Sequence, residues 1–593
     1  MFQMQWPNCP LRVYRFARSP SNVHITCSSP CVVCPYIERQ RALGHTRPVV
    51  RTVQVVFALG MMGCGAGETG GDPSSGDGGD ADRTVDLPRS GPIVTYEPGI
   101  DPELANRAAN EVPQAVDDPA LRPEIVYPYD HTAMPPNLYL VEWQWHPVGG
   151  ADLYVTTFEG RLTTVHHVST SSSFILDPVT WRALANGNLA TPMTVTVRAA
   201  SRDNLARAGA ASIEIRIGPS ELLGGLYYFS TTEGETQQGI FRYDFGVPVA
   251  TATSFLTQQA AGECVGCHAV SRDGSRMGVT FLGGYGNLAT LDVSNPGQYL
   301  IGGPAGPQRG GFVQFFDDDR GLLAVYDNQP DDAADPLNGQ IRVYDTATGA
   351  ADDTRLVPLT AGRRGSHVAV APDGLTVAFV EYTDVSHRPI FEEEGAIMMS
   401  LYRPNTRSWD TPRTLVPFDG TYNNYYPSFS PDGQWLLFNR AQSGRAYDNP
   451  AASIWVIRAD GSGDPIELVS ANRLEGVTNS WPRWAPFVQE SEFGNQQMWF
   501  AFSSKRDYGL RLVGEERAQL WMASFEPATA LSGGDGSAPA FWLPFQNIET
   551  QNHTPTWTER VAPRECMTDN DCADPALRCE PSSYECVPVD ILL

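Results

Sequence analysis

A short hairpin pattern that recurs along the second half of the chain constrains the fold more than any other feature. Residues 270–281, 370–381 and 429–440 read VSRDGSRMGVTF, VAPDGLTVAFVE and FSPDGQWLLFNR. Each copy joins two apolar strands through an Asp-Gly pair, whose residues accept the positive φ angles of a tight two-residue turn. With the degenerate copies FFDDDRGLLAVYD at 315–327 and WPRWAPF at 481–487, the copies recur at roughly 50-residue spacing. A third strand follows each full copy, which predicts a β-propeller.

The number of first strands predicts the number of blades. First strands begin near residues 267, 312, 366, 425, 480 and 553, which indicates six blades within 220–560. The last of these strands has no partner after it, whereas unpaired strands at 226–231, 239–245 and 249–256 precede the first blade. We therefore expect the two ends of the repeat region to complete one blade together, because that closes the ring and removes exposed sheet edges.

Two resemblances complete the predicted fold. The "APDG" and "SPDG" cores resemble the repeat of TolB-type propellers over about residues 224–560. Strands such as LYLVEWQWHPV and MTVTVRAASRD within 136–219 resemble a fibronectin type III or immunoglobulin-like module. The predicted class is all-β, a six-bladed propeller preceded by a β-sandwich and followed by a small cysteine-rich tail at 561–593. The TolB resemblance implies a protein-binding scaffold.

The front of the chain has the pattern of a lipoprotein signal. An apolar run in residues 51–64 ends in MMGC, which resembles a bacterial lipobox and predicts lipidation at Cys64. The Gly/Ser/Asp-rich stretch that follows opens a flexible tether and extended lead-in over 65–135. Residues 1–50 precede the signal and are interpreted as a misassigned extension. The expected location is the outer membrane or cell surface, with the membrane contacted through the lipid anchor.

Charge and motifs exclude several functions. The formal net charge is −26, whereas a protein that binds nucleic acid needs a basic surface, so nucleic acid is not an expected partner. The chain has no G-x-S-x-G elbow, P-loop or dinucleotide-binding fingerprint, so no enzyme chemistry is nominated. A redox protein or another envelope protein is the expected partner.

The segment CVGCH holds Cys264, Cys267 and His268. Its two cysteines are the only ones between Cys64 and Cys566. C-x-x-C-H is the attachment motif of c-type cytochromes, in which two thiols bind the haem vinyl groups and the imidazole binds iron. We therefore predict one covalent haem c at the channel mouth, acting in electron transfer or haem-based sensing. His553 is the preferred sixth iron ligand, then His367, then an open position.

Other chemistries remain open for the same segment. A Cys264–Cys267 disulfide would leave a TolB-like scaffold without haem, although it would close a small, strained loop. A redox dithiol prefers a helix N-terminus, and a zinc site needs further ligands. The four tail cysteines, Cys566, Cys572, Cys579 and Cys586, are expected to form two disulfides in an exported protein.

Overall fold

A computed structural model describes residues 91–559, with gaps at 232–236, 246–250, 283–285, 329–334, 384–387 and 493, together with residues 572, 577–579 and 586–588. The predicted extension, signal segment and Cys64 therefore lie outside the described residues, as does Cys566. Among the described helices, none is both long and apolar enough to cross a membrane.

The N-terminal region, residues 93–217, folds around two sheets. One sheet has the order β1-β7-β6-β9-β10-β2, with β4 also paired to β10, and the other has the order β3-β5-β8. The elements are β1 (Ile93–Tyr96), α1 (Pro102–Glu111), η1 (Val112–Gln114), β2 (Val116–Asp117), η2 (Pro119–Leu121), β3 (Ile125–Tyr127), β4 (Thr132–Met134), β5 (Glu142–Trp145), β6 (Leu153–Glu159), β7 (Thr164–Ser169), β8 (Ser173–Ile175), α2 (Pro178–Asn186), β9 (Pro192–Ser201) and β10 (Asn204–Ile217).

This region differs from the expectation in two respects. Residues 93–134, expected as an extended lead-in, contain a helix and four strands of the folded region. Three pairings of the larger sheet, β1 with β7 and β10 with β2 and β4, are parallel. A fibronectin type III-like module is not confirmed. The two sheets share an aromatic core, in which the Trp143 ring meets Phe158 edge-on and Trp145 lies beside Tyr154.

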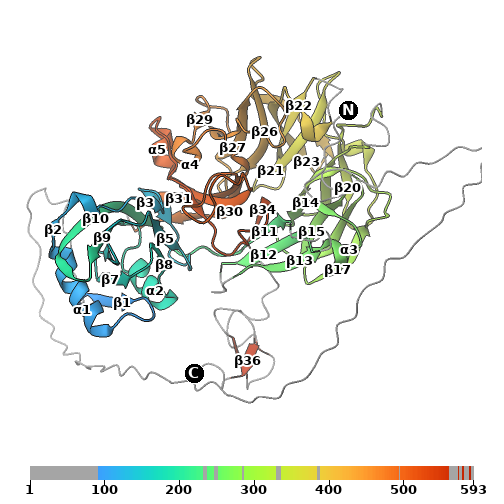
Figure 1. Cartoon of the computed structure of the whole chain (residues 1–593). Coiled ribbons are helices and arrows are strands. Elements are labelled where there is room, and N and C mark those ends of the chain that lie inside the picture. Colours follow the sequence, from blue (N-terminus) through green and yellow to red (C-terminus); the bar gives the residue numbers. More distant parts are fainter. Residues whose placement is uncertain are drawn as a thin grey trace, which may run out of the picture. The chain divides into compact units, whose positions relative to one another are not determined.

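Six small sheets follow and form the blades of a β-propeller (Figure 1). Five of them are each built from one continuous segment of the chain. In chain order they contain β14 (Val265–Val270), β15 (Arg276–Phe281), β16 (Leu288–Asp292) and β17 (Asn295–Gly302); β18 (Gly311–Phe316), β19 (Gly321–Val325) and β20 (Ile341–Asp345); β21 (Arg364–Val370), β22 (Thr376–Tyr382), β23 (Ala396–Arg403), β24 (Ser408–Trp409) and β25 (Arg413–Val416); β26 (Tyr422–Phe429), β27 (Trp435–Gln442), β28 (Ser453–Arg458) and β29 (Ile466–Glu467); and β30 (Ser480–Glu490), β31 (Gln496–Ser504), β32 (Gln519–Phe525) and β33 (Phe541–Trp542).

The sixth blade joins the two ends of the propeller, as predicted. Its strand order is β13-β12-β11-β34, with β11 (Gly225–Ser230), β12 (Gly239–Asp244), β13 (Thr253–Thr257) and β34 (Asn552–Thr558). The innermost strands β14, β18, β21, β26, β30 and β34 each contact the next, and β34 contacts β14. The ring is therefore closed by hydrogen bonds between segments more than 300 residues apart, such as Leu226 beside Trp557.

Short helical elements lie between the strands of the propeller. They are α3 (Gln258–Ala261), η3 (Asp353–Arg355), η4 (Pro389–Phe391), α4 (Val469–Asn472) and α5 (Pro527–Leu531). In the tail, β35 (Leu577–Cys579) pairs antiparallel with β36 (Cys586–Pro588), with Cys579 opposite Cys586. Cys572 is disulfide-bonded.

The repeated hairpin turns differ from the predicted type. Gly274, Gly374 and Gly433 have positive φ, but the preceding aspartates do not. The glycine N–H donates to the carbonyl three residues earlier, from Gly274 to Ser271 at 2.9 Å. This is a type I turn that ends in a left-handed glycine. The aspartate is favoured for another reason, since its carboxylate accepts from the following backbone, as in Ser275 N–H to Asp273 at 3.0 Å.

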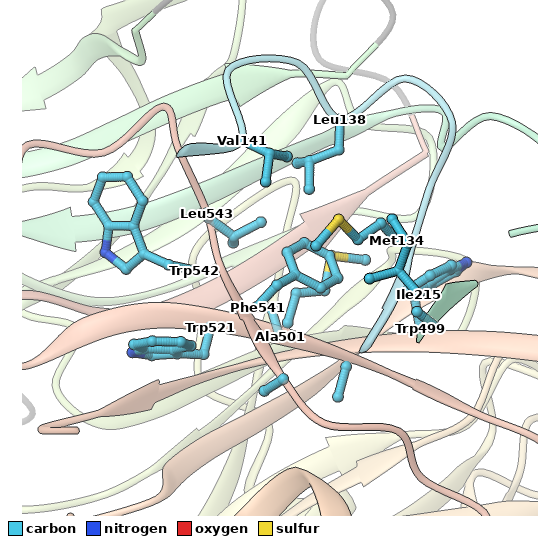
Figure 2. Packing of buried hydrophobic residues seen from close by; sticks show 14 of the residues in the cluster. Met134, Leu138, Val141, Ile215, Trp499, Ala501, Trp521, Phe541, Trp542 and Leu543 are labelled. Atoms are coloured by element: carbon cyan, nitrogen blue, oxygen red, sulfur yellow. The ribbon is translucent and has the colours of Figure 1, made fainter. Parts of the chain in front are cut away.

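The N-terminal region packs on the propeller through β31, β32 and β33. Figure 2 shows Met134, Leu138 and Val141 beside aromatic side chains of this blade. Trp499 and Trp521 are fully buried there. A polar contact also crosses the boundary, because the backbone N–H of Trp542 donates to the Tyr127 hydroxyl at 3.1 Å.

Candidate functional site: the axial channel

Every inner strand carries a β-bulge at the same level. The pairing of each inner strand with its neighbour shifts register there, as between Ser366 and Val368 in β21. Five of the six residues at this level have positive φ, from +30° at His367 to +55° at Trp481. A bulged residue leaves the ladder and its side chain is re-aimed. The six residues, which we call the plug, are Cys267, Phe312, His367, Tyr426, Trp481 and Thr554.

The plug closes the centre of the propeller. The His367 ring lies 4.3 Å from both the Phe312 and Tyr426 rings, and the Tyr426 and Trp481 rings stack at 3.9 Å. The cavity that remains beside them has a volume of about 20 Å³. This is room for a water molecule and no more.

A wider cavity of about 500 Å³, which we call the funnel, adjoins the plug. All six inner strands line it, together with residues that follow five of them. Two residues beyond the plug, the inner strands carry Ala269, Gln314, Ala369, Ser428, Arg483 and Thr556. Because three of these side chains are small, the channel widens above the plug. The funnel has the volume of an ordinary ligand pocket.

The funnel has an acidic rim and one cation near its floor. Its lining includes the carboxylates of Asp273, Asp318, Asp319 and Glu559. Burial, with a smaller repulsion from Asp273, raises the pKa of Asp319. Arg483 lines both the funnel and the 20 Å³ cavity, so it marks the boundary between them.

The structure separates the two cysteines of the CVGCH segment. Cys264 is disulfide-bonded, whereas Cys267 is a buried free thiol. The Cys264–Cys267 disulfide left open by the sequence is therefore not formed. Cys267 lies in the strand β14, whereas Cys264 precedes that strand. Burial raises the pKa of the Cys267 thiol to about 11.

The three histidines of the predicted iron site divide between two cavities. His268 and His367 line the 20 Å³ cavity, and His553 lines another of about 190 Å³ with Lys505 and Asp448. Burial lowers the pKa of His268 and of His553 to about 4, and lowers that of His367 well below its usual value. All three imidazoles are therefore neutral at pH 7. The Nε2 atoms of His268 and His367 are buried and have no hydrogen-bond partner.

The described arrangement does not fit a covalent haem c. The buried, unpartnered Nε2 of His268 is an atom that iron would satisfy. However, Cys264 is engaged in a disulfide, so one of the two thiols that the attachment requires is not free. A porphyrin also cannot enter a 20 Å³ cavity. Within the described ranges, no group of three or more His, Cys, Asp or Glu side chains is arranged to hold a metal ion.

Arg483 is the site residue that the sequence interpretation missed. It stands in WPRWAPF, which is a degenerate copy of the repeat. The signal was available in the alignment of the copies, where Arg483 occupies the position of Ala269, Ala369 and Ser428. A lone charge in a column of small residues that faces the channel is the feature that could have identified it.

Comparisons with known proteins found similar solved structures at low TM-scores. No protein-family model and no curated protein matches the chain. Similar solved structures include a putative TolB from Agrobacterium tumefaciens (14% identity, 57% of this chain and 99% of that one, TM-score 0.31). Others are a protein from Lactobacillus plantarum (12%, 56% and 99%, TM-score 0.30) and a putative 6-phosphogluconolactonase from Bacteroides uniformis (11%, 54% and 99%, TM-score 0.28).

Proposed function

We propose that this protein is an exported binding scaffold that receives a partner in the funnel of its propeller. The observation that carries the proposal is the 500 Å³ cavity, to which all six blades contribute and which the plug closes from below. A pocket with a rigid floor and walls from six sheets suits recognition. Among the described side chains that line the funnel, none forms a nucleophile–base pair of the kind that catalysis uses.

Site-specific photo-crosslinking in the native host tests this function. A photoreactive amino acid replaces Asp318, whose side chain is 91% exposed at the rim. The matched control carries the same amino acid at Leu531, which is 64% exposed and does not line the funnel. We expect an adduct of defined mass from position 318 only. Equal adducts from both positions, or none from either, would reject the funnel as the binding site.

A second candidate function is electron transfer or haem-based sensing through one covalent haem c at Cys264, Cys267 and His268. The neutral, buried and unpartnered Nε2 of His268 favours it. Haem iron would supply a one-electron couple or a site for a small ligand. Attachment requires release of Cys264 from its disulfide and widening of the channel beside Cys267. His367 lines the same small cavity as His268, whereas His553 does not.

A pyridine haemochrome spectrum distinguishes the two candidates. The chain from Cys64 onward, with that cysteine replaced, is exported in a host that has cytochrome c maturation. An α band that survives acid–acetone extraction and is absent from the Cys264→Ala/Cys267→Ala variant would establish the haem. A colourless protein from the same host would reject it and leave the scaffold function.

Export and anchoring form part of the proposal and rest on the sequence alone. Lipidation of Cys64 would hold the propeller at the outer membrane or cell surface, where it meets envelope proteins. Incorporation of labelled palmitate into the wild-type chain and its loss in Cys64→Ser would support this. Equal labelling of both chains would contradict it.

A further inference from the structure

We propose that Arg483 at the floor of the funnel binds a carboxylate, and that the funnel accepts the C-terminal end of a peptide. The inference deepens the scaffold function and rests on it. It names the chemical class that the pocket recognises.

The guanidinium of Arg483 is held with one edge free. Its Nη1 group donates to the carbonyl oxygens of Pro427 and Pro482, each at 3.1 Å. These two bonds use both Nη1 hydrogens and orient the guanidinium plane. The Nε and Nη2 groups have no acceptor among the described residues. The edge formed by Nε and Nη2 is one that binds a carboxylate through two parallel hydrogen bonds.

The charge of Arg483 is also unpaired. No Asp or Glu in the described part of the chain forms an ion pair with it. Burial lowers its pKa to about 10, so the guanidinium stays charged at pH 7. Its electrostatic neighbours Tyr426 and Cys267 are both acids whose pKa burial raises, so they provide no counter-charge. Arg483 is half-buried, and a partly desolvated charge without a counter-ion is costly, so a bound anion would reduce that cost.

The surroundings leave room for the ligand. Ala369 and Ser428 stand at the level of Arg483 on neighbouring strands and fill little of the channel. Trp484, the next residue along β30, packs its ring against Phe500 and Phe525 in the core of the blade. The floor of the funnel is therefore left to Arg483.

The rim selects among anions. Asp273, Asp318, Asp319 and Glu559 would repel a ligand with several negative charges. A peptide end with one carboxylate, preceded by a basic side chain, matches both the cationic floor and the acidic rim. The charge pattern therefore favours a basic peptide terminus over a phosphate or a dicarboxylate.

The test uses the whole exported chain and two pools of tripeptides with Lys first and mixed residues after it. One pool ends in a free carboxylate and the other in an amide. Equilibrium dialysis with mass spectrometry measures the bound fraction for the wild type, Arg483→Met and Arg272→Met. Arg272 is the matched control, because it lines the rim and donates to Pro372 at 2.7 Å. Equal thermal midpoints show that the variants are folded.

We expect the wild type and Arg272→Met to prefer the free-acid pool at least tenfold, and Arg483→Met to lose that preference. Equal binding of acid and amide pools by the wild type would overturn the carboxylate assignment while leaving the funnel as a binding site. Absence of binding by either pool would overturn the peptide proposal, and the crosslinking experiment then decides the scaffold function separately. An unchanged preference in Arg483→Met would overturn the role of that residue.

A second measurement remains informative if Arg483→Met does not fold. Phenylglyoxal labels accessible arginines, and peptide mapping reports the labelling of each one. We expect acetate to slow labelling of Arg483 severalfold and to leave Arg272 unchanged. Equal protection of both arginines, or of neither, would contradict a carboxylate site at the floor.

Discussion

His367 and Glu392 form a buried acid–imidazole pair beside the plug, with Nδ1 and Oε1 3.3 Å apart. Glu392 is fully buried and His367 is 2% exposed. Neither carboxyl oxygen of Glu392 has a hydrogen-bond partner. Burial raises the pKa of Glu392 well above its usual value and lowers the pKa of His367 well below its own. Burial therefore favours the neutral form of both members of the pair.

Glu392→Gln is expected to change how stability depends on pH. A raised carboxyl pKa stabilises the folded state below pH 4.5, and that stability is lost as pH rises toward the folded pKa. The lost free energy of unfolding is about 1.4 kcal/mol per pH unit within this window. The variant lacks the titrating group, so its stability relative to the wild type should increase with pH above 4.5.

Urea unfolding between pH 5 and pH 9 measures this difference. His367 acts in the opposite direction but only below pH 6.5, since its pKa is lowered, so the window above pH 6.5 isolates Glu392. Glu490→Gln on the exposed end of β30 is the control. A constant difference between the wild type and Glu392→Gln across the range would contradict a buried neutral acid.

The sequence was sufficient for the ring but not for its interior. The Asp-Gly hairpins and the unpaired terminal strands predicted six blades and their closure, because both depend on local turn chemistry and on counting strands. Simple alternation along a strand cannot predict which side chain enters the channel, since a bulge shifts the register there. That shift places Cys267 among the aromatic rings of Phe312 and Trp481 instead of at an open mouth.

Cys267 should resist alkylation in the native protein. With its pKa near 11, about a thousandth of the thiol is ionised at pH 8, and the side chain is also buried. Iodoacetamide at pH 8 should label Cys267 only after unfolding in guanidinium, and Cys264 only after reduction as well. Peptide mapping by mass spectrometry reads both. Rapid native labelling of Cys267 would contradict its burial, and failure of both to label after unfolding and reduction would indicate covalent modification.

Thr554→Gly tests the backbone strain of the plug. Thr554 has φ of +54°, which costs a residue with a Cβ about 1–2 kcal/mol. Glycine relieves that strain, although the hydroxyl bond to the His553 carbonyl is lost. We expect a change in unfolding free energy near zero, whereas Thr556→Gly in the same strand, without positive φ, should lose about 1 kcal/mol. Urea unfolding compares them, and an equal or larger loss in Thr554→Gly would exclude strain at the plug.

Asn552→Ala tests the side-chain hydrogen bonds that join β11 and β34 at the two ends of the ring. Asn552 is fully buried at the start of β34, and its Oδ1 accepts from Ser230 in β11 at 2.6 Å and from Thr550 at 2.9 Å. Its Nδ2 donates to the Asn547 carbonyl at 2.8 Å. Truncation removes these three hydrogen bonds, each of which contributes about 0.5–1.5 kcal/mol, although the Ser230 and Thr550 hydroxyls keep other acceptors.

We expect Asn552→Ala to lower the unfolding free energy by about 2–4 kcal/mol and to speed hydrogen exchange first in β11 and β34. The control is Asn106→Ala, whose side chain is exposed on α1 and donates only to the Pro102 carbonyl. It should change stability by less than about 0.5 kcal/mol. If hydrogen exchange in β11 stays as slow as in the wild type while another blade exchanges faster, the Asn552 hydrogen bonds do not determine the stability of the sixth blade. Selective opening of β11 and β34 would show that closure depends on this one amide.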